Sequence, residues 1–180
     1  MYILGDIGNT ETKIWLVSKK SKIIKKIYFS SKEITNNKLS KIFIKNNFQF
    51  KYIEKILFCS VVPQTFNLIK KFLSKKTNRN CYEVKSLNLK SLIKVKVDYK
   101  QIGSDRITNA ISLMNVKNNY IILDFGTATT FDVIVKKIYL GGIIAPGVKL
   151  SLNTLSDKAT LIPKIDLKKI TKVIGSNTIS

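Results

Sequence analysis

The chain has 180 residues, and its 32 lysines and arginines against 11 aspartates and glutamates give a formal net charge of +21. Hydrophobic residues make up 44% of the sequence, a share typical of globular domains, which excludes a disordered polyelectrolyte. The sequence contains no histidine, so histidine-based acid–base catalysis, Ser-His-Asp triads and histidine-ligated zinc are all excluded.

Hydrophobic spacing predicts strands and helices that alternate along the first hundred residues. Helical spacing predicts one helix over residues 39–48, and Pro63 is suited to the first turn of a second helix that runs to residue 73. Short apolar runs rich in β-branched residues predict the strands, which cover residues 2–6, 13–17, 23–29 and 55–62 and lie near 82–84 and 93–97.

A further helix and three more strands are expected in the rest of the chain. Ile107, Ala110, Ile111 and Met114 share one helical face, with Ser104 as the expected N-cap. The strands are expected over residues 120–124, 130–135 and 138–140. This succession of hairpins and strand–helix units predicts an α/β fold.

One short pattern occurs twice, 118 positions apart. An apolar strand ends in Asp-x-Gly at Asp6 and again at Asp124, and small polar residues and a second apolar strand follow in each case. Two equivalent strand–turn–strand units are typical of a duplicated domain plan with a ligand between the halves. Two unrelated β-hairpins with Asp-Gly-type turns would explain the same residues, but the matching flanks favour duplication.

The two turns offer the groups that bind a nucleotide phosphate. Glycine lets the backbone approach closely, neighbouring amides and hydroxyls bind phosphate oxygens, and an aspartate holds a cation. The sequence lacks G-x-x-x-x-G-K-[ST] and G-x-G-x-x-G, which excludes recognisable P-loop and dinucleotide-binding sites. Phosphoryl transfer depends on positioning and charge neutralisation, so a phosphotransferase needs no histidine.

Between the two turns, an acidic and a basic residue stand side by side where the helix after residue 103 is expected to begin. Asp105 has the chemistry to accept a proton from a hydroxyl nucleophile, and Arg106 has the fork that binds a carboxylate. An aspartate that favours the helix dipole beside a solvated arginine explains the same pair without a site. This segment alone leaves both explanations open.

Seven segments together resemble the type III pantothenate kinase family, in family order and over nearly the whole chain. They are Asp6–Thr10 (DIGNT), Ser60–Pro63 (SVVP), Gly103–Ala110 (GSDRITNA), Asp124–Thr130 (DFGTATT), Gly141–Gly147 (GGIIAPG), Lys158–Pro163 (KATLIP) and Ile174–Thr178 (IGSNT). The resemblance implies an actin-like, ribonuclease H-like fold of two duplicated domains, at residues 1–115 and 116–180. It also implies ATP-dependent phosphorylation of pantothenate, the first step of coenzyme A biosynthesis, in a homodimer.

The resemblance also assigns roles to single residues. Asp105 is the expected proton acceptor for the primary hydroxyl of pantothenate, which attacks the γ-phosphate of ATP in line. Asp6 is expected beside Mg²⁺, and Asp124 beside a monovalent cation, K⁺ or NH₄⁺. The residues expected to bind ATP are Asp6, Ile7, Gly8, Asn9, Thr10, Glu11, Thr12, Lys13 and Thr127. The residues expected to bind pantothenate are Tyr99, Gly103, Ser104, Asp105, Arg106 and Thr178.

The chain is shorter than the family pattern. It stops two residues past Thr178, although the segment 176–178 is suited to cap a helix. The second domain is therefore expected to be incomplete at its C-terminus, with apolar sheet surface exposed. This leaves two alternatives open: a non-catalytic relative that acts as a regulatory or transcription accessory protein, and another phosphotransferase of the same superfamily.

The positive charge is uneven, since residues 13–100 hold 22 basic and four acidic residues. Only Arg79 and Arg106 are arginines, whereas proteins that read nucleic acid depend on arginine forks and stacking aromatics. The charge therefore favours a solvated lysine surface over nucleic-acid binding. Two cysteines without metal spacing, the lack of an apolar span and the lack of a basic leader predict a cytoplasmic protein with no membrane contact.

Overall fold

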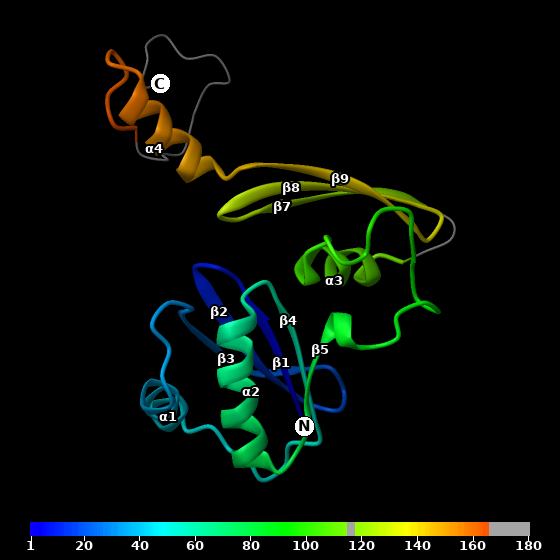
Figure 1. The fold of residues 1–180 in the computed structure, drawn as a ribbon. Coiled ribbons are helices and arrows are strands. Elements are labelled where there is room, and N and C mark those ends of the chain that lie inside the picture. Colours follow the sequence, from blue (N-terminus) through cyan, green and yellow to red (C-terminus); the bar gives the residue numbers. More distant parts are fainter. Residues whose placement is uncertain (115–117, 166–180) are drawn as a thin grey trace.

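The computed structural model describes residues 1–114 and 118–165, in which two β-sheets lie one above the other with a helix between them (Figure 1). The first sheet has the strand order β3-β2-β1-β4-β5, and its first three strands form an antiparallel meander beside the parallel strands β4 and β5. These strands are β1 (Tyr2–Ile7), β2 (Glu11–Val17), β3 (Ile23–Ser30), β4 (Lys55–Ser60) and β5 (Cys81–Glu83).

The second sheet repeats the meander. Its strand order is β6-β9-β8-β7, in which β7, β8 and β9 are antiparallel and β6 runs parallel to β9. Asp6 and Asp124 are each the second-last residue of the first strand of a meander, so the duplicated sequence pattern is a duplicated structural unit. The strands are β6 (Lys94–Val95), β7 (Asn119–Phe125), β8 (Ala128–Val135) and β9 (Ile138–Pro146).

Helices cover the first sheet on one face and separate the two sheets on the other. The helices are α1 (Asn36–Lys45), α2 (Pro63–Thr77), the short 3₁₀ turn η1 (Val84–Ser86), α3 (Ser104–Ser112) and α4 (Val148–Lys158). Helices α1 and α2 pack on the first sheet, and α3 lies between the sheets (Figure 1). Within the described ranges, no helix is both long and apolar enough to cross a membrane.

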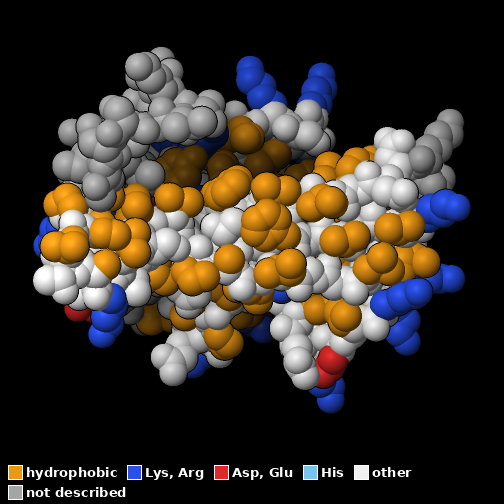
Figure 2. Space-filling view, turned by 90° about the horizontal axis from the view of Figure 1, so that it is seen from above, with side chains coloured by type: hydrophobic (Ala, Val, Ile, Leu, Met, Phe, Trp, Pro, Cys, Tyr) orange, Lys and Arg blue, Asp and Glu red, His pale blue; other side chains and the backbone are white. Residues whose placement is uncertain are grey.

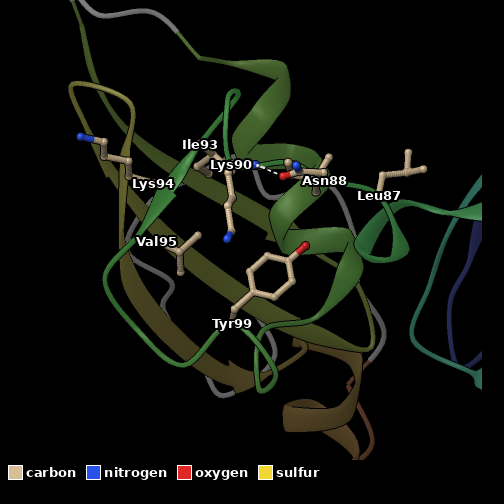
Figure 3. A pocket seen from close by; sticks show the side chains of 8 residues that line it. Leu87, Asn88, Lys90, Ile93, Lys94, Val95 and Tyr99 are labelled. Carbon is tan, nitrogen blue, oxygen red and sulfur yellow. Dashed lines mark hydrogen bonds between the residues drawn. The ribbon is translucent and has the colours of Figure 1, made fainter.

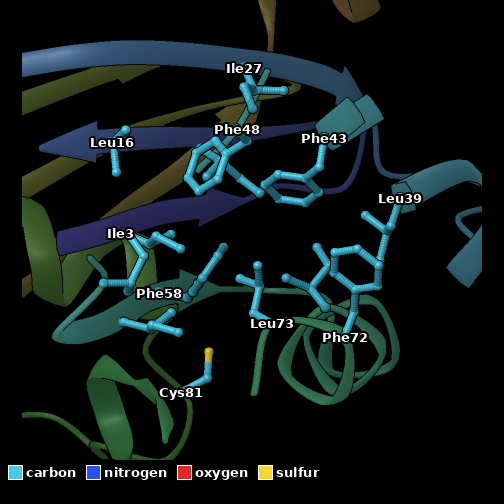
Figure 4. Packing of buried hydrophobic residues seen from close by; sticks show 14 of the residues in the cluster. Ile3, Leu16, Ile27, Leu39, Phe43, Phe48, Phe58, Phe72, Leu73 and Cys81 are labelled. Atoms are coloured by element: carbon cyan, nitrogen blue, oxygen red, sulfur yellow. The ribbon is translucent and has the colours of Figure 1, made fainter. Parts of the chain in front are cut away.

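The main core follows from the alternation of side chains along β1. Ile3 and Ile7 are fully buried under α1 and α2, whereas Asp6 points to the opposite face, toward α3. Aromatic rings fill the space between these helices and the sheet (Figure 4). The ring centroid of Phe43 lies 5.0 Å from that of Phe48 and 5.4 Å from that of Phe72. Each such ring contributes about 1.5–3 kcal/mol by burial, so this core holds β1 rigidly.

The α/β prediction is confirmed, and the strand positions agree closely with the expected ones. Some boundaries were wrong for local reasons. Helix α1 begins at Asn36, three residues before the predicted start. Thr35 caps it there, since its Oγ1 accepts a hydrogen bond from the amide of Lys38 at 3.2 Å. The cap of α3 is Gly103, not Ser104, and α3 ends before Met114.

In the second half of the chain, the sequence analysis predicted β9 too short and did not predict α4. Strand β9 runs on to Pro146, and α4 follows it as a helix that the hydrophobic spacing did not indicate, because none of its residues is buried. The predicted domain boundary at 115/116 and the segment 174–178 lie outside the described residues, so the division into domains stays a prediction.

The face of the second sheet that points away from α3 carries exposed apolar side chains. Ile121 and Phe125 on β7 and Ile143 on β9 are each 67% exposed, and the strand register places them on one face. Figure 2, which looks onto the molecule from this side, shows hydrophobic side chains gathered across it. The expectation of uncovered apolar sheet surface therefore agrees with the described residues.

The close contact between β1 and β4 predicts that Gly5 tolerates no side chain. An alanine Cβ there would lie 1.9 Å from Cε1 of the fully buried Phe58 ring. We expect Gly5→Ala to lower the free energy of unfolding by about 1–3 kcal/mol, measured by urea denaturation. Gly126→Ala is the control, because its Cβ would lie 3.6 Å from the nearest atom, in ordinary contact. Equal losses in the two variants would contradict this account.

Candidate functional site

The two Asp-x-Gly turns and the start of α3 enclose one cleft of about 470 Å³. Three aspartates line this cleft from different elements, Asp6 from β1, Asp105 from α3 and Asp124 from β7, beside one glutamate of β2. The remaining lining residues are Gly8, Asn9, Thr10, Glu11, Lys13, Val61, Phe125, Gly126, Thr127, Ala128 and Thr130. Residues predicted from two distant parts of the sequence are thus brought together.

Asp6 is held by its neighbours on both adjacent strands. Lys13, its register partner on β2, places Nζ 3.9 Å from Asp6 Oδ2, and Cys59 on β4 donates from Sγ to Asp6 Oδ1 over 3.4 Å. Burial raises the pKa of the Cys59 thiol well above its usual range, and the charge of Asp6 raises it further. Cys59 therefore stays protonated and acts as a hydrogen-bond donor, a contact that the sequence analysis missed.

The two turns meet each other across the cleft. Gly8 donates from its amide to the carbonyl of Glu11 at 3.0 Å, and Gly126 donates to that of Ala128 at 2.9 Å, so both turns are closed by their own backbone. The hydroxyls of Thr10 and Thr127 are hydrogen-bonded at 3.0 Å. The two hydroxyl-bearing turns therefore touch each other at the cleft, and turns of this kind present the amides and hydroxyls that bind anions.

Asp105 is the second residue of α3, and its carboxylate is partly buried. Its Oδ1 accepts a hydrogen bond from the amide of Arg106 at 2.8 Å. Burial raises the pKa of Asp105 above its ordinary value of 3.8, the charges of Asp6 and Asp124 raise it further, and the amide of Arg106 opposes them. A carboxylate with a raised pKa in a cleft is suited to accept a proton.

Asp124 is exposed at the rim of the cleft and accepts a hydrogen bond from Asn109 Nδ2 at 2.8 Å. Among the described residues, no group of three or more acidic or cysteine side chains has the arrangement of a metal site. Asp6 and Asp124 are single carboxylates, and Mg²⁺ is commonly held by one or two carboxylates together with substrate phosphates. The donors present in the cleft therefore fit a nucleotide-bound Mg²⁺.

Two residues of the predicted ATP-binding turn point away from the cleft. Ile7 is fully buried in the core, and Thr12, also fully buried, shares a hydrogen bond of 2.8 Å between its Oγ1 and Ser31 Oγ. Neither side chain lines the cleft, because alternate residues of a strand face opposite sides. Any contact that these two residues make with a ligand in the cleft runs through their backbone.

The predicted pantothenate residues are divided among neighbouring hollows. Gly103 and Ser104 line a hollow of about 490 Å³ that shares Val61 with the cleft. Tyr99 lines a separate, mostly apolar pocket of about 720 Å³, where its ring lies beside Lys90 and Val95 (Figure 3). Thr178 lies outside the described residues.

Arg106 does not line the cleft, because its guanidinium is bound to Asp132 on β8. Nε donates to Asp132 Oδ1 at 2.8 Å, and Nη2 lies 2.6 Å from the same oxygen. Sequence analysis missed Asp132, although a signal was present. An aspartate between Phe131 and Val133 in an apolar strand has to be paired if it is buried, and Asp132 is fully buried.

Comparison with known proteins gives consistent matches. The family model for type III pantothenate kinase matches residues 2–180. The type III pantothenate kinase of Pelagibacter ubique is 61% identical over 180 residues, which are 100% of this chain and 73% of that protein. That of a Sulfurihydrogenibium species is 38% identical over 191 residues, which cover 100% of this chain and 74% of that protein.

Solved structures share the fold at low identity. A protein of Campylobacter jejuni assigned to the Baf family of transcriptional activators superposes with a TM-score of 0.52 at 20% identity, over 94% of this chain and 68% of that one. A protein of Sinorhizobium meliloti assigned as a 2-dehydro-3-deoxygalactonokinase has a TM-score of 0.52 at 6% identity, over 89% and 58% of the two chains. At these identities the likenesses concern the fold alone, and they agree with the actin-like fold that the resemblance implies.

The raised pKa of Asp105 predicts a cost in stability. Because the folded state favours the protonated carboxyl, the ionised carboxylate destabilises the fold at neutral pH, and this penalty disappears as the pH falls toward 3.8. We therefore expect Asp105→Asn to raise the free energy of unfolding at pH 7 and to lose that advantage near pH 4, measured by urea denaturation. Asp157→Asn, on the exposed face of α4, serves as the control and should change little. A destabilised Asp105→Asn variant at pH 7 would contradict the prediction.

Proposed function

The chain belongs to the type III pantothenate kinase family, and we propose that its cleft performs the family's reaction with Asp105 as the proton acceptor. That reaction is the ATP-dependent phosphorylation of pantothenate in coenzyme A biosynthesis. The observation that carries the proposal is the single cleft in which Asp105 faces both Asp-x-Gly turns. A base beside two phosphate-binding turns is the arrangement that transfer of a phosphoryl group to an alcohol requires.

We propose that the segment 6–13 and Thr127 bind the phosphates of ATP. Thr10 and Thr127 line the cleft from opposite turns, with their hydroxyls hydrogen-bonded to each other at 3.0 Å, and Lys13 adds positive charge beside Asp6. Asp6 would hold Mg²⁺ together with phosphate oxygens, and the bound ion would neutralise phosphate charge. The chain's own contribution is to fix the phosphates in line with the incoming hydroxyl.

Asp105 accepts the proton of the primary hydroxyl of pantothenate as the hydroxyl oxygen attacks the γ-phosphorus. The new oxygen–phosphorus bond forms while the bond from the γ-phosphorus to the bridging oxygen breaks, so ADP leaves and the proton stays on Asp105. Burial and the charges of Asp6 and Asp124 raise the pKa of Asp105, which makes it a stronger base than a solvated carboxylate.

Pantothenate is proposed to lie against Tyr99 and the segment 103–105, with Thr178 as a further contact. The hollow that contains Gly103 and Ser104 adjoins the cleft at Val61, which gives the substrate a path to Asp105. The resemblance also predicts that Arg106 binds the carboxylate of pantothenate. The guanidinium of Arg106 is bound to Asp132 and does not line the cleft, which argues against that prediction.

We also propose a monovalent cation site, a homodimer and a cytoplasmic location. A monovalent cation, K⁺ or NH₄⁺, would bind near Asp124, which is exposed at the rim. The exposed apolar face with Ile121, Phe125 and Ile143 supports a homodimer, because such faces are typical of protein–protein contacts. Buried free thiols at Cys59 and Cys81 support a cytoplasmic location.

The two alternative functions are less well supported. The matched relatives in Pelagibacter and Sulfurihydrogenibium are named as kinases, which does not favour a regulatory role. The likeness to the Baf family structure, at 20% identity, concerns the fold alone. The family match over residues 2–180 disfavours another sugar or acetate phosphotransferase.

Removal of the proposed base tests the function directly. Asp105→Asn keeps the size of the side chain but cannot accept the proton, so we expect turnover to fall by about 10² or more while ATP binding is retained. Turnover is measured as pantothenate-dependent release of ADP, and ATP binding is measured by calorimetric titration. Asp157→Asn on α4 is the matched control, with turnover unchanged. Near-normal turnover in Asp105→Asn would overturn the assignment of the base.

The proposed cation at Asp124 predicts a salt-specific rate. We expect ADP release with pantothenate and Mg²⁺ to be fast in K⁺ or NH₄⁺ and several-fold slower in Na⁺ at equal ionic strength. Asp124→Asn should remove most of this difference, because the carboxylate that would hold the ion is gone. Equal rates of the unmodified protein in K⁺ and Na⁺ would count against a monovalent cation at this position.

A further inference from the structure

The ion pair between α3 and the second sheet is one of the most deeply buried polar contacts among the described residues. The side chain of Arg106 is 12% exposed and that of Asp132 is fully buried. Burial opposes the charge of Arg106, but the bond to Asp132 outweighs it and raises the pKa of the guanidinium. The guanidinium therefore stays charged, and neither side chain can turn to solvent without leaving its partner buried and unpaired.

Strand β9 completes the site around this pair. The hydroxyl of Tyr139, which is 1% exposed, donates to Asp132 Oδ1. Gly142 is the register partner of Asp132, and a Cβ there would lie 1.9 Å from the carbonyl oxygen of Phe131, 2.6 Å from Arg106 Nη2 and 2.9 Å from Asp132 Oδ1. The backbone of β8 and the guanidinium thus leave no room for a side chain at Gly142, which gives a physical reason for one glycine of the GGIIAPG segment.

The pair is joined directly to the proposed base. Arg106 follows Asp105 in the first turn of α3, and its amide donates to Asp105 Oδ1 at 2.8 Å. Anchoring the side chain of Arg106 on β8 therefore fixes the backbone group that holds the carboxylate of Asp105. The same anchor ties α3 to the sheet that carries Asp124 and the second turn (Figure 1).

We propose that Asp132, with Tyr139 and Gly142, positions Arg106 so that Asp105 is held between the two turns, and that Arg106 is a positioning residue and not the ligand of the pantothenate carboxylate. The inference rests on the proposed role of Asp105 as proton acceptor. A small displacement of a catalytic group costs rate without necessarily weakening binding. The substrate carboxylate is then recognised by other groups of the pantothenate site.

The two roles of Arg106 predict different kinetics. In Arg106→Lys, the planar fork on Asp132 is lost while the positive charge remains. A positioning role predicts that kcat falls by about tenfold or more and that KM for pantothenate changes less than twofold. Direct binding of the carboxylate predicts a raised KM with kcat retained. Arg79→Lys is the matched control, because Arg79 Nε donates to the carbonyl of Ile53, which precedes β4 at the end opposite the cleft.

A second substrate separates the two roles independently of folding. Pantothenol has a hydroxyl where pantothenate has its carboxylate. If Arg106 only positions Asp105, the ratio of kcat/KM for pantothenate to that for pantothenol is the same in the unmodified protein, Arg106→Lys and Asp132→Asn. If Arg106 binds the carboxylate, that ratio falls in Arg106→Lys, because the fork that pairs with the carboxylate is lost, and the proposal is overturned.

A double variant covers the case in which single variants fail to fold. Replacing both charges in Arg106→Met/Asp132→Leu leaves no unpaired charge, so the fold should persist by circular dichroism and thermal unfolding. We expect kcat to stay at least tenfold low in this variant, and kcat equal to that of the unmodified protein would overturn the inference alone. Near-normal turnover in Asp105→Asn would instead overturn the role of Asp105 as proton acceptor, on which this inference rests. The two experiments therefore distinguish a failure of the proposed function from a failure of the positioning role of Arg106.

Discussion

The concentration of three aspartates in one cleft is the constraint on which the rest of the structure depends. Asp6, Asp105 and Asp124 repel one another, and burial raises the pKa of Asp105. The fold must therefore hold them from three separate elements, each anchored elsewhere: β1 in the aromatic core, β7 in the second meander and α3 on both sheets. With 32 basic residues against 11 acidic ones, the chain is otherwise strongly positive, and the cleft is a local exception.

Much of this arrangement could be predicted because its signals are local. Strand alternation, the proline that starts α2 and the repeated Asp-x-Gly lie within short windows of sequence, and the repeat placed Asp6 and Asp124 at equivalent strand ends. The contacts that hold the carboxylates could not be predicted in the same way. Cys59 meets Asp6 across 53 positions and Arg106 meets Asp132 across 26. The first pair follows from the register of β1 and β4 and the second from the packing of α3 on β8, and periodicity specifies neither.

The division of the predicted pantothenate residues also has a physical reason. Sequence order placed Tyr99 and Asp105 in one segment, but the chain turns between them at Gly103, the cap of α3. Lys85 holds this turn, since its Nζ donates to the carbonyl of Ile102 at 2.6 Å and lies 5.1 Å from the ring centre of Tyr99. Residues that are close in sequence therefore line different hollows, which only the backbone path can reveal.

Glycine placement connects these observations. The sequence analysis explained only the glycines of the two Asp-x-Gly turns, by close approach of the backbone to a ligand. Three of the chain's other glycines lie where one element meets another: Gly5 lies against the ring of Phe58, Gly142 lies against the guanidinium of Arg106, and Gly147 lies against the carbonyls of the Gly126–Thr127 turn. Each permits a contact that bears on β1, α3 or the second turn, the three elements that present the carboxylates. The glycines of this family pattern are therefore explained as much by the support of the site as by the ligand within it.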